Sequence, residues 1–593
     1  MNHVSKDSLR DFTTDARVLM LAGISLGIGA LATGAAYVLQ WLIGLVTHLA
    51  YFGTWVPHMV SPAGSPLGLW AALVPVAGGL VVGLMARYGS EKIRGHGIPE
   101  AIEAILIGGS RIEPKVAVLK PISSAIAIGT GGPFGAEGPI IMTGGALGSL
   151  VAQFLHLSSA ERKTLLVAGA AAGMAATFGT PVAAVLLAVE LLLFEWKPRS
   201  FIPVAVACTV AAVLRPFVIG TAPLFPMAHY GALGWPGLLA CVGIGIVEGC
   251  GSGILTAMVY GFEDLFRRLP IHWMWWPALG GLAVGIGGLF APRALGVGYD
   301  IIADLLNNRL GIEAIIVLVA VKASIWSISL GSGTSGGVLA PLLIMGGALG
   351  AVAGHFIPLA DPGYWAMIGM AAIMGGTMRS PLTGIVFLLE LTHSFGALLP
   401  LLIACTTAFA STVLLLRRSI LTEKLARRGQ HITREYIVDP FEITRIADVM
   451  VSTVATLPGT MPVEEAVKLF TSEPPAGERR HKSYPVVDEE RRLIGAVSRA
   501  DALRWLMRGW VPGTTLAGVV GEAESVLIGH PDELVGDLAD RMAAADIGRV
   551  PIVDRATRQL LGIVSRKDLL RVRARMVAEE RERHPLLRLR PAR

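Results

Sequence analysis

Residues 138–148 read Gly-Pro-Ile-Ile-Met-Thr-Gly-Gly-Ala-Leu-Gly, and residues 340–350 read Ala-Pro-Leu-Leu-Ile-Met-Gly-Gly-Ala-Leu-Gly. In both stretches the same number of residues separates the proline from the Gly-Gly-Ala-Leu-Gly run. The two stretches lie about 200 residues apart in the chain. This correspondence indicates an internal duplication.

A second pair of matches supports the duplication. Thr180-Pro181 precedes Glu190, and Ser380-Pro381 precedes Glu390 at the same spacing. Both glutamates end apolar runs, so we expect each carboxylate to accept hydrogen bonds from a loop. The sequence does not distinguish inverted from parallel repeats, but inverted repeats are the commoner arrangement for a binding site built from broken helices.

The duplicated region is apolar and rich in glycine. Of the 593 residues, 53% are hydrophobic, only 16% are charged and 71 are glycine. A soluble domain has nearer a quarter of its residues charged, so most of this chain is expected to lie in lipid. Several apolar stretches are too short to cross a hydrocarbon core of about 30 Å. Broken helices at membrane depth line cavities, which predicts a binding site near the midplane.

Basic residues flank the apolar region at both ends. Arg10 and Arg17 precede it, and a basic cluster at residues 417–428 follows it. The positive-inside rule therefore predicts that both termini are cytoplasmic. We expect an integral protein of the plasma or inner membrane. The net charge of +6 is modest and forms no basic stripe, which argues against nucleic acid as a partner. The four cysteines lie in apolar runs without metal-ligand spacing, so no metal site is predicted.

Three Gly-rich segments inside the membrane region are candidates for a binding site. They are Gly95-His96-Gly97-Ile98-Pro99-Glu100, residues 135–139 and residues 336–341. In each, a proline follows a glycine-containing turn, which is typical of a helix start. Free backbone N–H groups and the positive end of the helix dipole suit an anion there. Three such starts could bind a small anion without a lysine or arginine that would hold it too tightly.

Two ionisable residues stand out in the same region. Glu137 is flanked by Gly135 and Gly138 inside an apolar segment, where a charge is expensive and usually functional. Its carboxylate could compete with an anion for the same donors and swing away when protonated. Lys120, in a short apolar run, could attract anions or form a structural salt bridge.

Through these segments, residues 18–428 resemble the CLC family of chloride channels and chloride/proton antiporters. Gly95–Pro99, Gly135–Pro139 and Gly337–Pro341 are similar to the family's GSGIP, GREGP and GxFxP segments. The resemblance implies an all-α polytopic membrane protein with an inverted-repeat helical domain. It also implies a homodimer in membrane lipid, with one pore for chloride or a similar anion in each subunit.

The resemblance also implies roles for individual residues. Glu137 would be the gating glutamate, and Lys120 would be the lysine beside the pore. The anion would be held by residues of the helix starts, which are His96, Gly97, Ile98, Gly138, Val338, Leu339 and Leu421.

Several positions depart from the family pattern. The usual serine is His96, the central tyrosine is Leu421, and Leu191 stands where many antiporters have an inner proton-pathway glutamate. Ala136 replaces the arginine before the gate, and Leu339 replaces a phenylalanine. Backbone donors are therefore expected to carry more of the anion binding. His96 could also titrate near neutral pH and strengthen anion binding in mild acid.

Three functions are compatible with these residues. Leu191 favours a passive anion channel gated by Glu137, whereas the retained Glu137 favours a proton-coupled anion antiporter. A divalent-cation channel is the third, but its pore would need acidic side chains or carbonyl rings. No zinc spacing, nucleophile elbow or phosphate-binding loop indicates an enzyme.

The C-terminal part reads as soluble and contains a second repeat. Two stretches, 484–501 and 550–568, each predict strand, turn, strand and then a helix beginning near Ser-x-x-Asp. This part resembles a pair of CBS domains, a small α/β tandem that often binds adenine nucleotides. The resemblance implies four nucleotide-binding candidates, Ser498, Asp501, Ser565 and Asp568. No other cofactor is expected.

These observations divide the chain into six predicted parts. They are a cytoplasmic N-terminal segment at 1–17, a CLC-type transmembrane domain at 18–428, a linker at 429–445, CBS domains at 446–510 and 511–575, and a charged tail at 576–593.

Overall fold

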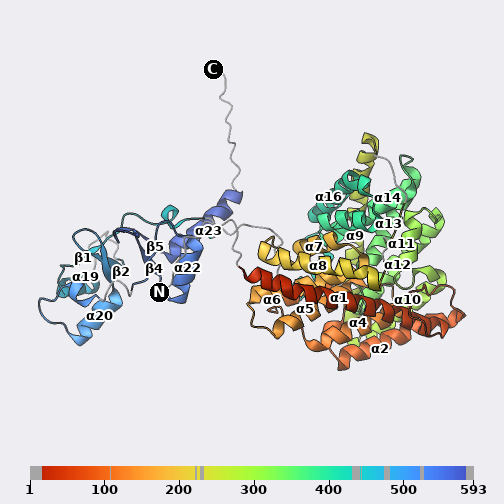
Figure 1. Cartoon of the computed structure of the whole chain (residues 1–593), viewed down its shortest axis with the longest axis horizontal. Coiled ribbons are helices and arrows are strands. Elements are labelled where there is room, and N and C mark those ends of the chain that lie inside the picture. The colour runs from red at the N-terminus through yellow and green to blue at the C-terminus, as the bar shows by residue number, and fades with distance from the viewer. Residues whose placement is uncertain are drawn as a thin grey trace, which may run out of the picture. The chain divides into compact units, whose positions relative to one another are not determined.

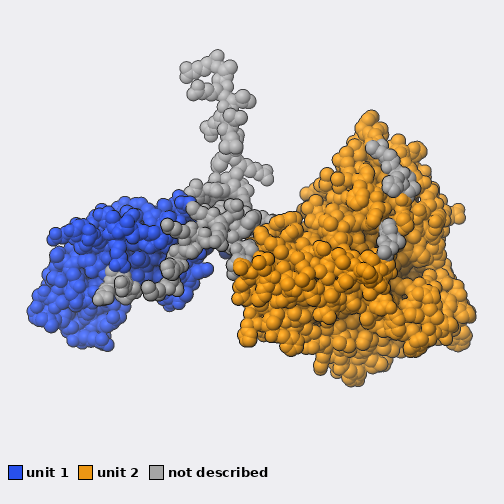
Figure 2. Space-filling view, viewed as in Figure 1, with its two compact units in different colours: residues 1–10, 436–593 blue, residues 11–435 orange. Residues whose placement is uncertain are grey.

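The computed structural model describes residues 16–106, 108–220, 224–227, 233–429, 441, 444–472, 481–520 and 526–581. The chain divides into two compact units, one of residues 11–435 and one that contains residues 436–593 (Figure 2). Arg10 and nearly all of the predicted N-terminal segment lie outside the described residues, as do most of the linker and residues 582–593 of the tail. The six predicted domain boundaries stay a prediction.

The larger unit is helical (Figure 1). Eight of its described helical segments are long and apolar enough to cross a membrane. The helices of the first half are α1 (Arg17–Thr47), α2 (Val74–Tyr88), α3 (Ile98–Leu106), α4 (Pro114–Gly129), α5 (Glu137–Gln153), α6 (Ser159–Phe178), α7 (Pro181–Leu187) and α8 (Pro198–Val218). Those of the second half are α9 (Trp235–Arg267), α10 (Trp276–Phe290), α11 (Tyr299–Leu306), α12 (Ile312–Gly331), α13 (Leu339–Phe356), α14 (Pro362–Met378), α15 (Pro381–Thr392), α16 (Leu398–Leu415) and α17 (Ile420–Arg427).

Glycine lets paired helices touch backbone to backbone in both halves. A Cβ atom on Gly144 would lie 2.2 Å from the carbonyl oxygen of Gly169, and one on Gly169 would lie 2.1 Å from that of Gly144. Gly346 and Gly369 repeat this contact, at 2.6 Å and 2.3 Å. Small residues therefore hold α5 against α6 and α13 against α14, which lie side by side in Figure 1.

The predicted structural role of the two glutamates is confirmed, but each carboxylate binds the start of a helix and not a loop, and the contacts are reciprocal. The Glu190 carboxylate, in the π-helical segment Ala188–Leu193, accepts hydrogen bonds from the N–H groups of Leu382 (3.2 Å) and Thr383 (2.8 Å) at the start of α15. The Glu390 carboxylate, in α15, accepts them from residues 182 and 183 in α7, at 3.0 Å and 2.8 Å. Each half thus caps a helix of the other, the relation expected of two repeats about an approximate two-fold axis.

The smaller unit is α/β. Its first sheet has the order β1 (Leu457–Pro458), β2 (Ser483–Val487), β3 (Leu493–Ser498), and its second pairs β4 (Arg549–Val553) with β5 (Leu560–Ser565). The pairs β2–β3 and β4–β5 are antiparallel hairpins. The helices are α19 (Val463–Thr471), α20 (Arg499–Arg508), α21 (Leu516–Val519), α22 (Val535–Ala544) and α23 (Arg566–Arg581). The predicted strand, turn, strand and helix are confirmed in both repeats.

Candidate functional site

The three Gly-rich segments meet in the structure. Gly337 donates its N–H to the Gly135 carbonyl at 2.9 Å, and Gly135 donates to the Gly337 carbonyl at 3.2 Å. Gly336 donates its N–H to the carbonyl of Gly95 at 3.4 Å. The helix starts predicted from the Gly-Pro pattern, those of α3, α5 and α13, are thereby joined through their backbones.

Glycine is required at this junction because there is no room for a side chain. Gly97 has a φ of +89°, and a Cβ atom on it would lie 2.6 Å from the carbonyl oxygen of Gly138. A Cβ atom on Gly138 would lie 1.9 Å from the carbonyl oxygen of His96. The close backbone approach brings the N–H groups of these helix starts into one small region.

Glu137 occupies that region. Its side chain is fully buried at the first residue of α5. One carboxylate oxygen, Oε1, accepts a hydrogen bond from the backbone N–H of Ala340 in the first turn of α13. The other, Oε2, has no hydrogen-bond partner among the described residues. The carboxylate oxygen therefore stands where an anion bound to the α13 helix start would lie.

The first Gly-rich turn is partly filled by a side chain. Glu100 accepts a hydrogen bond from the N–H of Gly97 at 3.0 Å through Oε2, while its Oε1 pairs with Lys424 at 2.6 Å. His96 is buried and its Nδ1 has no partner among the described residues. Glu100 thus accepts a hydrogen bond from an N–H group that we expected to be free for an anion. The sequence did not predict this contact. Titration of His96 stays a prediction.

The hydrophobic candidates bring no polar side chain to the junction. Ile98, Val338 and Leu339 are buried at the helix starts, so their contribution to binding would come from the backbone. Leu421 is buried in the first turn of α17. Leu191 is buried in the π-helical segment beside α7.

Lys120 is fully buried and is bound by backbone oxygens. Its Nζ donates to the carbonyls of Ile93 (2.8 Å) and Gly95 (2.7 Å), which flank the first Gly-rich turn. Lys322 in α12 repeats this arrangement with the carbonyls of Ala294 (2.8 Å) and Gly296 (2.9 Å). Lys120 therefore holds the turn in place, and its influence on the pore electrostatics stays a prediction. The sequence analysis missed Lys322, although it lies at the offset of the duplication.

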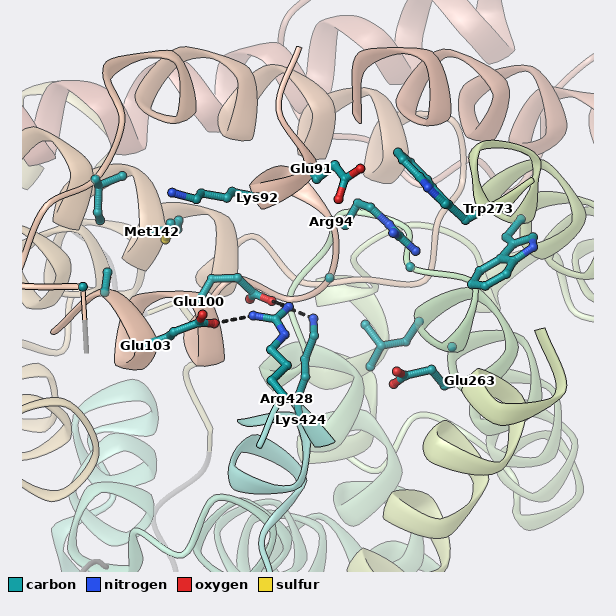
Figure 3. Close-up of a pocket in the computed structure, with 18 of the residues that line it drawn as sticks. Glu91, Lys92, Arg94, Glu100, Glu103, Met142, Glu263, Trp273, Lys424 and Arg428 are labelled. Carbon is teal, nitrogen blue, oxygen red and sulfur yellow. Dashed lines mark hydrogen bonds and ion pairs between the residues drawn. The ribbon is translucent and has the colours of Figure 1, made fainter. Parts of the chain in front are cut away.

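A cavity of about 620 Å³ opens beside the first turn and is lined by both signs of charge (Figure 3). On one side Glu100 and Glu103 of α3 reach Lys424 of α17 and Arg428, the residue that follows that helix. The remaining charged residues of the lining are Glu91, Lys92, Arg94, Arg111, Glu263 and Arg267. Basic residues outnumber acidic ones in this lining, which also includes Gly95.

The four nucleotide-binding candidates form two helix caps. The Asp501 carboxylate accepts hydrogen bonds from the N–H (2.9 Å) and hydroxyl (2.6 Å) of Ser498 at the start of α20. Asp568 accepts the same two bonds from Ser565, at 3.0 Å and 2.5 Å, at the start of α23. These serine and aspartate side chains therefore stabilise the helix starts, whatever else they bind.

The fold and the site define a membrane transport protein of two helical repeats with an anion-like carboxylate at their junction. Residues 78–412 match the family described as voltage gated chloride channel, and residues 446–508 and 524–575 match the CBS domain. The chain belongs to this voltage gated chloride channel family, CLC. It is therefore an integral membrane anion transport protein with C-terminal CBS domains, and not an enzyme. This membership excludes the divalent-cation channel considered from the sequence.

Several known proteins are similar to this chain. The H(+)/Cl(-) exchange transporter ClcA of Salmonella arizonae is 30% identical over 395 residues, covering 62% of this chain and 82% of that protein. ClcA of Vibrio campbellii is 29% identical over 448 residues, covering 72% and 94%. A putative ClcB-like chloride channel protein of Ralstonia nicotianae is 29% identical over 377 residues, covering 62% and 88%.

Solved structures show the same fold. A slow cyanobacterial Cl-/H+ antiporter is 25% identical with a TM-score of 0.60, and the match covers 70% of this chain and 99% of that one. A eukaryotic CLC transporter is 19% identical with a TM-score of 0.57, and its match covers 93% and 98%. The predicted helical membrane domain followed by a small α/β region is thereby confirmed.

Proposed function

We propose that this protein carries chloride or a similar small monovalent anion, with the Glu137 carboxylate as the gate. The observation that carries the proposal is the hydrogen bond from the Ala340 N–H to Glu137. A carboxylate that accepts this bond competes with an anion for the same helix start. Protonation removes its negative charge, weakens the bond to the N–H group and lets the side chain leave.

The gate predicts a specific response to pH. Anion flux through the parent protein in liposomes rises as the pH falls, because more Glu137 is protonated and displaced. Glu137→Gln imitates the protonated side chain, so its flux is high and nearly independent of pH. The matched control is Glu190→Gln, a second membrane glutamate that only caps α15. If the two variants have the same pH profile as the parent, Glu137 is not the gate.

We propose that the pathway is passive. Leu191 supports this, because a buried leucine at the inner proton-pathway position cannot pass a proton. A second candidate is anion/proton exchange, favoured by the retained Glu137 and by the similarity to exchange transporters. A chloride gradient across liposomes separates them: a passive pathway moves no protons against their gradient, and an exchanger does.

We propose three further features of the assembly. The protein is a homodimer with one pathway per subunit, located in the plasma or inner membrane with both termini in the cytoplasm. The apolar groove of about 550 Å³ on α7 and α8, which exposes Val182, Trp196 and Val213, supports an apolar partner surface. The mass of the protein in detergent, measured by light scattering, distinguishes a dimer from a monomer.

We also propose that the CBS pair binds an adenine nucleotide through Asp501 and Asp568. Both aspartates match the ribose-binding pattern, and each keeps a second carboxylate oxygen paired only with an arginine three residues later, at 3.2 Å. Calorimetric titration of the full chain with ATP gives binding that is lost in Asp501→Ala or Asp568→Ala. No heat of binding to the parent would refute the site.

A further inference from the structure

The turn before α11 is the second-half counterpart of the turn before α3. Gly298 has a φ of +80°, close to the +89° of Gly97, and Tyr299 follows it as Ile98 follows Gly97. The preceding carbonyls are held by Lys322, as described for Lys120. Tyr299 therefore takes the place of Ile98 in the repeat, and it brings a hydroxyl group where the first half has only a hydrocarbon.

The Tyr299 ring is fixed but its hydroxyl is unused. The ring packs edge to face on Phe178 (centroids 6.3 Å apart, planes at 71°) and on Phe225 (5.8 Å, 69°). The hydroxyl oxygen is buried and has no hydrogen-bond partner among the described residues. A buried hydroxyl without a hydrogen-bond partner is unfavourable, so this group requires an explanation.

Tyr299 lies on a turn that packs against α13, the helix whose first turn binds Glu137. A Cβ atom on Gly298 would lie 2.8 Å from the side chain of Ile344, one helical turn beyond Ala340. Tyr299 and Glu137 each have a buried oxygen without a hydrogen-bond partner among the described residues, and both belong to segments that contact α13.

Tyr299 also faces open space. Tyr299 is among the residues that line a separate cavity of about 120 Å³, together with Gly296, Gly298 and Asp300. The turn that carries Tyr299 therefore borders both this cavity and α13.

We propose that the Tyr299 hydroxyl is a ligand of the transported anion. When the Glu137 carboxylate leaves the Ala340 N–H, the anion that replaces it accepts a hydrogen bond from Tyr299. This proposal rests on the proposed function of Glu137. A neutral hydroxyl donor suits a small monovalent anion that must also be released, because it lacks the strong hold of a full charge. It supplies the side-chain hydroxyl that His96 and Leu421 do not.

Tyr299→Phe tests the proposal, because it removes the hydroxyl and keeps the ring that packs on Phe178. The measurement is chloride binding to the purified full-length protein by calorimetric titration. We expect chloride to bind about tenfold more weakly, as a lost hydrogen bond to a charged group implies. The control is Tyr364→Phe, which removes the hydroxyl of a buried α14 tyrosine, with chloride binding unchanged. Parent-like binding by a folded Tyr299→Phe protein would overturn the proposal.

A second measurement separates an anion ligand from a group that merely holds Glu137. In a Glu137→Ala background, Tyr299→Phe must still weaken chloride binding. If the loss vanishes in that background, the hydroxyl serves only the glutamate and the proposal is wrong. If Glu137→Ala shows its predicted gating defect while Tyr299→Phe binds normally, the gate stands and only the Tyr299 proposal fails.

Discussion

In the first half of the membrane unit Lys120 binds two backbone carbonyls, and in the second half Lys322 does the same. Glu190 caps a helix of the second half, and Glu390 caps one of the first. The two halves also share their glycine contacts. Side chains present in both copies thus hold the backbone of the junction in place.

The halves differ at the helix starts that face the junction. Glu137 begins α5, whereas Leu339 begins α13. Ile98 begins α3, whereas Tyr299 begins α11. The duplicated side chains serve the fold, and we propose that those found in one copy carry the anion chemistry. Paired substitutions, one in each half, test this distinction.

The largest expected effect is at the helix contacts. Gly169→Ala and Gly369→Ala each place a Cβ atom within 2.1–2.3 Å of a carbonyl oxygen on the neighbouring helix. Each should destabilise the protein by about 3 kcal/mol, measured as the shift of chemical unfolding in detergent. Gly243→Ala on α9, with nothing within 4 Å of the new atom, is the control. If only one of the two alanine variants were destabilised, the helix contacts of the two halves would not be equivalent.

The buried lysines should have the next largest effect. Lys120→Met and Lys322→Met each leave two buried carbonyls without a donor, so each should cost about 2–3 kcal/mol. The two losses, measured by the same unfolding assay, should be similar. If Lys120→Met instead keeps its stability and loses chloride binding, Lys120 belongs to the pore and not to the duplicated scaffold.

The smallest effect is expected at the exchanged glutamates. Glu190→Gln and Glu390→Gln keep an acceptor but lose the charge that favours a helix start, so each should cost about 1 kcal/mol. Glu113→Gln, which alters a half-exposed ion pair with Lys92, should change stability very little. A change of anion selectivity in either capping variant would count against a purely structural role.

Much of this architecture follows from the sequence. The Gly-Pro pattern at 135–139 and 336–341 predicted helix starts, and the matched spacing of Glu190 and Glu390 predicted the repeat. The two carboxylates bind helix starts, however, and not the expected loops. These predicted features are local or periodic, so they can be recognised in the amino-acid sequence. The structure then shows that the helix starts meet.

Other features could be recognised only in the folded chain. Glu100 turns back onto the N–H of Gly97, and Lys322 finds carbonyls 26 and 28 residues away in the chain. Tyr299 packs its ring on Phe178 of the other repeat. Neither spacing nor composition shows which buried donor meets which acceptor, because these contacts depend on how the two halves pack.

We propose that the Glu137 carboxylate occupies the position of a bound anion at the start of α13. Anomalous diffraction from bromide-soaked crystals of Glu137→Ala tests it most directly. We expect a bromide ion within hydrogen-bond reach of the Ala340 N–H in this variant and none there in the parent protein. An Ala340 N–H without bromide in the variant, at concentrations that support flux, would contradict the account.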